Sequence, residues 1–177
     1  MTFRLEIPTL ETQRLRLRAP RPDDFETFAT FFAAPRTEYI GGPKNRSDSW
    51  WELAGTLGMW AFRGFGMWMV EEKATGAVIG RVGPWAPDGW PEPEIGWSLF
   101  EGREGRGYAT EAALEARDWA YRTAGWTTAI SLIAPQNAAS KAVATRLGCA
   151  PEGRFVHPEE GWEAEIWRHP SAAELSA

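Results

Sequence analysis

The sequence predicts a mixed α/β fold, in which about seven strands form a mostly antiparallel central sheet flanked by four helices. Three observations predict it. Several short segments alternate apolar and polar residues or are rich in β-branched residues, as strands are. Four other segments carry apolar residues at helical spacing. The predicted order is strand, two helices, three strands, helix, strand, helix and two strands, which differs from the regular alternation of a parallel sheet.

The chain opens with a strand and a helix. Residues 14–19, RLRLRA, alternate strictly, so Leu15 and Leu17 are expected to face inward. A helix is predicted within residues 20–33, because Pro22 suits a helix start and phenylalanines recur at helical spacing after it.

A second helix is predicted over residues 47–62, with Ser47 or Asp48 as its cap. The residues expected to form its apolar stripe are Trp50, Leu53, Ala54 and Leu57. Residues 67–72 and 77–85 follow as a hairpin joined by a turn containing Gly76.

The next strand is predicted over residues 94–100, and it leads through a glycine-rich loop into a helix over residues 107–124. The inward face of this helix is expected to be Ala109, Ala112, Ala113, Ala116, Trp119 and Ala120, mostly small residues that allow close packing on a sheet. Gly125 ends the helix.

The last third contains one buried strand, one helix and two further strands. Residues 127–134 are apolar and β-rich, as in a central strand. A short helix within residues 136–148 is capped by Asn137. Two strands are expected near residues 153–157 and 161–168.

Composition limits the classes of protein that the chain can belong to. The 177 residues are 44% hydrophobic and 24% charged, which is typical of one soluble domain spanning residues 1–177. The net charge of −5 argues against nucleic acid as a partner, because such a protein needs a basic face. One cysteine favours a reducing compartment. Since we find no membrane-spanning apolar run and no signal peptide, we expect a cytoplasmic protein without a membrane partner.

Tryptophan is unusually frequent, with eleven residues in the chain. Most are expected in the core, and some could line an apolar pocket. Tryptophan-rich exposed strands would also suit the interface of a homodimer.

The segment LFEGREGRGYAT contains three glycines before a helix, although glycine is entropically costly in ordered structure. The first turn of a helix has unpaired N–H groups and partial positive charge, so a loop without bulky side chains lets an anion approach. Such a site is a phosphate cradle, with Arg103 and Arg106 adding charge at its rim. The alternative is a loop that turns a corner and binds nothing. The spacing fits neither a Walker loop nor a dinucleotide fingerprint.

The blocks EIGWSLFEGREGRGYATEAALEARDWA and NAASKAVATRLG, after the opening LETQRLRLRAPRPDDFETF, resemble the GNAT superfamily of acyl-CoA N-acetyltransferases. Within it, the sequence is similar to the branch of ribosomal-protein N-terminal (Rim-type) acetyltransferases. The resemblance covers about residues 10–168 and implies the GNAT fold and acetyl-CoA as co-substrate, without a metal.

The resemblance also implies that the glycine loop binds the pyrophosphate of coenzyme A through backbone amides. The positions concerned are Arg106, Gly107, Tyr108, Ala109 and Thr110. Leu99 would meet the pantetheine arm with its backbone, and Asn137 could bond the same arm with its amide. Glu104 departs from the Gln or Arg of the family pattern, so we expect it to face solvent.

Acetyl transfer from a thioester needs a neutral amine and a proton for the leaving sulfur. Glu94, which begins the strand before the loop, is the preferred candidate for the base, and Glu92 is the reserve. The alternative for Glu94 is a solvated acid at the strand edge. The acidic residues of this part of the chain, Asp88, Glu92, Glu94 and Glu101, would attract an ammonium substrate.

Ser140 matches the serine of the Rim-type block and could protonate or orient the sulfur. The alternative is a serine that is merely tolerated in a first helical turn. Ala144 occupies the position at which many family members have a tyrosine acid, so that acid is absent.

Other chemistries are disfavoured. Cys149 is expected to be a small buried hydrophobe, and neither His157 nor His169 is spaced to partner it. Two histidines and one cysteine far apart do not form a metal-ligand pattern. By the resemblance, Trp50, Trp51, Trp85 and Trp90 are candidates for the wall of the acceptor site.

The sequence therefore predicts an acetyl-CoA-dependent N-acetyltransferase that works by direct attack in a ternary complex. Its acceptor would be a primary amine, either a protein N-terminus or a small molecule. The alternatives are a non-catalytic acyl-CoA-binding module with the same fold and an interaction domain that ignores nucleotides.

Overall fold

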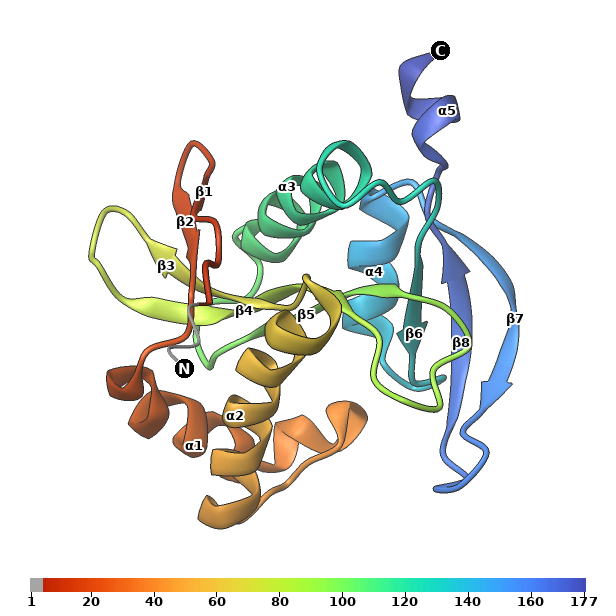
Figure 1. Ribbon diagram of the computed structural model, residues 1–177. Coiled ribbons are helices and arrows are strands. Elements are labelled where there is room, and N and C mark those ends of the chain that lie inside the picture. Colours follow the sequence, from red (N-terminus) through yellow and green to blue (C-terminus); the bar gives the residue numbers. More distant parts are fainter. Residues whose placement is uncertain (1–4) are drawn as a thin grey trace.

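A computed structural model describes residues 5–177, with one eight-stranded sheet and helices on both of its faces (Figure 1). The strands are β1 (Leu10–Glu11), β2 (Leu15–Arg18), β3 (Trp68–Glu72), β4 (Val78–Trp85), β5 (Glu94–Leu99), β6 (Ile130–Ile133), β7 (Ala150–Val156) and β8 (Glu163–Arg168). The α-helices are α1 (Phe25–Ala33), α2 (Arg46–Arg63), α3 (Tyr108–Arg122), α4 (Ala138–Arg146) and α5 (Ala172–Ser176). Two 3-10 helices, η1 (Pro22–Asp24) and η2 (Pro35–Ile40), flank α1.

The strand order is β1-β2-β3-β4-β5-β6-β8-β7, and every neighbouring pair is antiparallel except β5 with β6. The predicted mixed, mostly antiparallel sheet is confirmed. The strand β1 and the helix α5 were not expected. Both are only a few residues long, too short for a periodic pattern to show in the sequence.

Two apolar clusters lie on opposite faces of the sheet, because successive strand residues point to opposite sides. Trp68 and Val70 belong to the cluster that also contains the alanines of α3, whereas Met69 belongs to the cluster with the phenylalanines of α1. The predicted inward residues Leu15 and Leu17 are fully buried. The alanines predicted to face inward from α3 are also buried.

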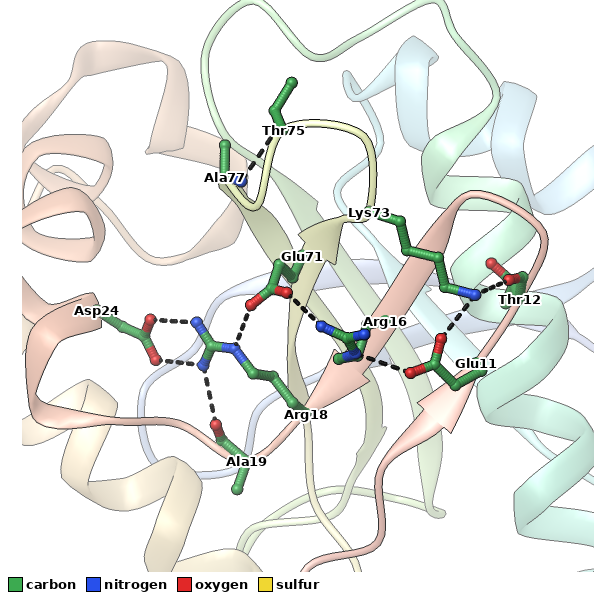
Figure 2. Close-up of polar contacts among 10 residues, drawn as sticks. All are labelled: Glu11, Thr12, Arg16, Arg18, Ala19, Asp24, Glu71, Lys73, Thr75 and Ala77. Atoms are coloured by element: carbon green, nitrogen blue, oxygen red, sulfur yellow. Dashed lines mark hydrogen bonds and ion pairs between the residues drawn. The ribbon is translucent and has the colours of Figure 1, made fainter.

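A chain of ion pairs crosses β1, β2 and β3 (Figure 2). Arg18 binds Asp24 of η1 at 2.7 Å and Glu71 at 2.9 Å, and Glu71 also binds Arg16 at 2.8 Å. Arg16 continues to Glu11 of β1 at 2.8 Å. Opposite charges alternate along this series of ion pairs. The series therefore joins β1, β2 and β3 and fixes the point at which η1 and α1 leave the sheet.

The prediction for α2 was wrong in two respects. The helix begins at Arg46, and its cap is Asn45, whose side chain accepts a hydrogen bond from Asp48 N. Trp50 is 51% exposed and Leu57 is 37% exposed. The buried residues of α2 are Ser49, Leu53, Thr56, Met59 and Trp60. The face that packs on α1 therefore includes small polar residues, which the apolar pattern does not reveal.

Candidate active site

The strands β5 and β6 separate in the middle of the sheet. In the part of the chain that the structure describes, they pair at one position, Glu94 with Ile130. Side chains replace the ladder where the strands part: Glu94 Oε2 accepts from Leu132 N at 2.9 Å, and Ser131 Oγ donates to Ile95 O at 2.6 Å. The separation is therefore stable, because the polar groups at its base are satisfied.

A cavity of about 530 Å³ opens at this separation. Residues from η2, α2, β4, the β4–β5 loop, β5, β6, α4 and the β7–β8 hairpin line it, among them Arg81, Trp85, Trp90, Trp97, Ser140 and Trp162. Its size suits a small molecule or the end of a longer chain.

Glu94 lines this cavity as the first residue of β5 and is only 7% exposed. Burial raises its pKa to about 7, while the N–H of Leu132, the indole of Trp90 and the charge of Arg81 oppose the rise. A carboxyl group with this pKa is close to half ionised at neutral pH. The expected alternative, a solvated acid at the strand edge, does not describe this residue.

Glu92, the reserve candidate, has a different environment. Both of its carboxylate oxygens bind Arg168 at 2.7 Å, and these contacts hold its pKa below the usual value. Glu92 is therefore ionised and occupied by a structural ion pair.

The glycine loop ends at Gly107, which is the N-cap of α3 and has a φ of +79°. The first bond of the helical series runs from Glu111 N to Gly107 O at 3.0 Å, so the amides of residues 107–110 come before it. Among the described residues, no side chain caps this end. The amides of Gly107, Tyr108, Ala109 and Thr110 are thus arranged as an anion cradle.

Side chains around the cradle are held by the protein itself. The Tyr108 hydroxyl donates to Glu72, and Arg103 binds the same carboxylate at 3.2 Å. Arg106 is exposed, while its carbonyl accepts from Arg14 Nη1 at 2.9 Å. Of the two rim arginines, Arg103 forms the ion pair with Glu72, whereas Arg106 acts on Glu72 through its charge.

Glu104 is exposed, as expected, and forms an ion pair with Arg36. This pairing directs the unexpected acid to the surface and leaves the cradle formed by backbone.

Ser140 and Asn137 both line the cavity. Trp97 Nε1 donates to Ser140 Oγ at 3.3 Å, and Asn137 Oδ1 accepts from Ser140 N at 3.1 Å, which makes Asn137 the cap of α4. Leu99 lies at the end of β5, paired with Gly80 of β4. Ala144 is fully buried in the core, where a tyrosine would need more space.

The chain matches the family described as "Acetyltransferase (GNAT) domain" over residues 14–150. It belongs to the GNAT acetyltransferase family. The protein is accordingly an N-acetyltransferase.

Known proteins support this assignment to the GNAT family. The "uncharacterized protein YkkB" of Bacillus subtilis (strain 168) is 32% identical over 147 residues, which cover 78% of this chain and 83% of that protein. An acetyltransferase structure from Agrobacterium tumefaciens str. C58 has 39% identity and a TM-score of 0.86, with 96% of this chain and 98% of that chain covered.

A more distant structure is a RimL ribosomal L7/L12 α-N-protein acetyltransferase in complex with coenzyme A. It has 16% identity and a TM-score of 0.76 and covers 92% of this chain and 97% of its own, so it shows a shared fold.

GNAT enzymes use acetyl-CoA, and the residues present here fit that group. A Cβ atom at Gly102 or Gly105 would meet no atom within 4 Å, so the loop beside the amides is open. The first turn of α3 offers free N–H donors, and the separated strands leave an open edge of β5.

Four tryptophans were expected at the wall of the acceptor site of this GNAT enzyme. Trp85 and Trp90 line the cavity, but Trp50 and Trp51 are 51% and 68% exposed on α2 and do not. The sequence reasoning missed Arg81 and Trp162, which also line it. A charged residue inside the apolar strand AVIGRVGPW was a usable signal for Arg81, whereas Trp162 carried none.

Arg81 is 5% exposed, and its Nη2 atom binds Glu52 of α2 at 2.6 Å. Its Nε and Nη1 atoms have no acceptor among residues 5–177, and the guanidinium lies 4.9 Å from the Phe32 ring. The aromatic ring compensates part of the buried charge.

Thiol chemistry is disfavoured because burial raises the pKa of Cys149 to about 12. Within residues 5–177, no group of three or more His, Cys, Asp or Glu side chains could hold a metal ion. No helix in the same part of the chain is long and apolar enough to span a bilayer.

Proposed function

We propose that this enzyme transfers the acetyl group of acetyl-CoA to a primary amine by direct attack in a ternary complex, with Glu94 as the general base. The observation that carries the proposal is the buried Glu94 carboxyl group in the cavity at the separation of β5 and β6, with a pKa of about 7. A base with a pKa near the working pH can accept a proton while about half of the molecules still carry it ionised, which is the favourable combination.

The amides of residues 107–110 would hold the pyrophosphate, with Arg106 at the rim. The backbone of Leu99 and the amide of Asn137 would hold the pantetheine arm. Acetyl-CoA supplies an activated thioester when it is bound there.

Glu94 takes one proton from the attacking amine nitrogen as the new C–N bond forms and the C–S bond breaks. The Ser140 hydroxyl can give its proton to the departing sulfur and take one from solvent, which restores the hydroxyl. Its oxygen accepts from Trp97, which leaves its own hydrogen free to donate.

Two acceptor classes fit the proposal, a protein N-terminus as in the Rim-type branch and a small-molecule amine. An α-amino group has a pKa of about 7.7–8.0, against roughly 10.4 for lysine, so it is more often neutral and asks less of the base. A cavity walled by tryptophans favours an amine attached to an apolar or aromatic group.

An acetylation screen tests the function. The enzyme and acetyl-CoA are incubated with a panel of N-terminal peptides and small amines, and acetylated products are detected by mass spectrometry. We expect one class to react. Thiol release without any acetylated amine would contradict the proposal.

The first prediction concerns Glu94→Gln. With the amine that the screen identifies, we expect kcat/KM to fall by about 100-fold or more, since general bases contribute at least that much. The rise in rate with pH, centred near 7 in the native enzyme, should disappear. Glu92→Gln should keep this rise. If the rise is lost in Glu92→Gln and kept in Glu94→Gln, the base is misassigned.

A further inference from the structure

We propose that Trp90 is a positioning residue that fixes the orientation of the Glu94 carboxyl group, and that the β7–β8 hairpin holds Trp90 in place for this task. The inference rests on the proposed role of Glu94 as the base. It adds a second residue to that role and assigns a task to a hairpin that is distant in sequence.

The contact itself is direct. Trp90 Nε1 donates to Glu94 Oε1 at 2.8 Å, while Leu132 N donates to Oε2 at 2.9 Å. Each carboxylate oxygen therefore has one fixed donor, on opposite sides of the group. The carboxyl plane cannot rotate without losing both bonds, so its remaining lone pairs keep one direction.

Trp90 lies between β4 and β5, outside any helix or strand, and needs support to hold its indole still. Residues of the β7–β8 hairpin provide this support. The Trp90 ring meets Trp162 at a centroid distance of 5.2 Å and His157 at 5.8 Å, both edge-on. Trp162 in turn stacks on His157 at 5.1 Å. Aromatic contacts of this kind are worth more than their buried area alone.

The backbone beside Trp90 is shaped for the same contact. Gly89 has a φ of +85°, and a Cβ atom there would lie 2.5 Å from His157 Nε2. Only glycine lets the imidazole approach this closely. The ring is fixed from its other side, because Nδ1 accepts from Glu160 N at 3.1 Å.

An ion pair also joins the segment between β4 and β5 to the β7–β8 hairpin. Arg168 of β8 binds Glu92 through both guanidinium nitrogens Nη1 and Nη2, each at 2.7 Å. The segment between β4 and β5 is thus tied to the hairpin at residue 92 as well as at residue 90. This explains why Glu92 serves structure while Glu94 stays available.

Glu94 is also influenced by other charged groups. Arg81 of β4 favours its ionised form. The remaining charged residues that line the cavity are Glu38, Lys44, Glu52, Glu160 and Glu163. Trp90→Phe removes the indole N–H and leaves all of these charged groups in place, so a shift of the Glu94 midpoint reports on the loss of the Trp90 side chain and not on the loss of a charge.

The experiment compares Trp90→Phe with the native protein by NMR of isotope-labelled glutamate carboxyl carbons, titrated with pH. Glu94→Gln identifies the Glu94 signal. Because the indole bond favours the carboxylate, its loss should raise the Glu94 midpoint by about one pH unit. Trp167→Phe is the matched control: it loses an indole N–H that bonds Glu165, and Trp167 does not line the cavity, so the substitution should leave the Glu94 midpoint unchanged.

Trp162→Ala tests the role of the hairpin while the indole of Trp90 remains. It should raise the Glu94 midpoint in the same direction as Trp90→Phe, by a smaller amount, because Trp90 loses its support. If Trp90→Phe and Trp162→Ala both leave the midpoint unchanged in folded protein, the inference is overturned.

Kinetics separate this inference from the proposed function. With the amine found in the screen, the acidic limb of the kcat/KM profile should shift to higher pH in Trp90→Phe. In the Glu94→Gln background, Trp90→Phe should cause no further change in this profile. If Glu94→Gln leaves the limb intact, the base assignment fails. If Glu94→Gln removes the limb but Trp90→Phe raises KM alone, Trp90 only lines the acceptor site and the inference fails by itself.

Discussion

Ser140 makes one contact through its backbone and a different one through its side chain. Its amide bonds the Asn137 side chain and so completes the cap of α4, while its hydroxyl lies in the cavity beside Trp97. The first contact uses backbone and the second uses the side chain. The two can therefore be separated by substitution.

The prediction for Ser140→Ala follows from that separation. The cap remains, so the melting temperature should change little. If the hydroxyl relays a proton to sulfur, kcat should fall by about 10-fold to 100-fold, toward the lower end of general acid catalysis. KM for acetyl-CoA should stay near its native value. A steady-state assay of thiol release measures both quantities, and an unchanged kcat would assign the serine to the helical turn alone.

At the scale of elements, α3 combines two features. Its alanines pack against the sheet, where Ala112, Ala113 and Ala116 are fully buried. Its first turn follows Gly107, which has a φ in the left-handed region, and among the described residues no side chain caps this end of the helix. The close approach of the helix to the sheet sets the position of the cradle relative to β5.

Gly107→Ala should weaken coenzyme A binding. A Cβ atom at this position would lie 3.5 Å from Arg14 Nη2, an ordinary contact, so the main effect is backbone strain of about 1–2 kcal/mol at positive φ. We expect the dissociation constant measured by calorimetry to rise by about 10-fold, the equivalent of ~1.4 kcal/mol. Gly125→Ala is the control, because its φ is +74° beyond the other end of α3. Similar weakening in both variants would contradict a specific role for Gly107.

The helix α2 carries exposed aromatic residues. Trp51 is 68% exposed and Phe62 is 91% exposed, whereas the strand tryptophan Trp68 is fully buried. A homodimer remains a prediction. If it forms, helix α2 is a better candidate for its interface than the strands that the sequence analysis favoured.

At the scale of the whole molecule, two buried groups with opposite pKa shifts lie near the separation of β5 and β6. His169 is 1% exposed, and burial and the Arg117 charge lower its pKa to about 3. It bonds Ser131 Oγ at 2.9 Å, and Ser131 in turn donates to Ile95 O beside Glu94. Because Arg117 can only donate, Nδ1 of His169 is the acceptor and Nε2 carries the hydrogen.

These shifts act on stability in opposite directions. A raised acid pKa means that the folded state holds a proton that the unfolded state has lost, so Glu94 lowers the free energy of unfolding as pH rises from 4.5 to about 7. The lowered pKa of His169 means that stability is lost as pH falls from 6.5 toward about 3. Between pH 4.5 and 6.5 the two slopes oppose each other.

Glu94→Gln should therefore change the shape of the stability curve. Relative to the native protein, its free energy of unfolding should rise by about 3 kcal/mol between pH 4.5 and pH 8, since each pKa unit is worth ~1.36 kcal/mol. Urea unfolding at several pH values measures this difference. A difference that stays constant with pH would show that Glu94 titrates normally in the folded protein.

Much of the fold could be predicted because its signals are local. The strand 14–19, the alanine face of α3 and the Asn137 cap each follow from residues a few positions apart. The strand-loop-helix order around Gly107 is likewise local, and the anion cradle inferred from it stays a prediction. The apolar stripe predicted for α2 was wrong, which shows where a local pattern fails. The sequence of a helix does not reveal which other element covers each of its faces.

The sequence by itself determined the order of elements, the glycines at positive φ and the residue types available for acid–base chemistry, since these depend on bonds and sterics within a few residues. The tertiary structure alone decided that Glu94 is buried while Glu92 is ion-paired, and that Trp162 reaches Trp90. Those outcomes depend on groups brought together across the sheet, where desolvation and single hydrogen bonds set the pKa of a carboxyl group. No local pattern records which distant residues will supply them.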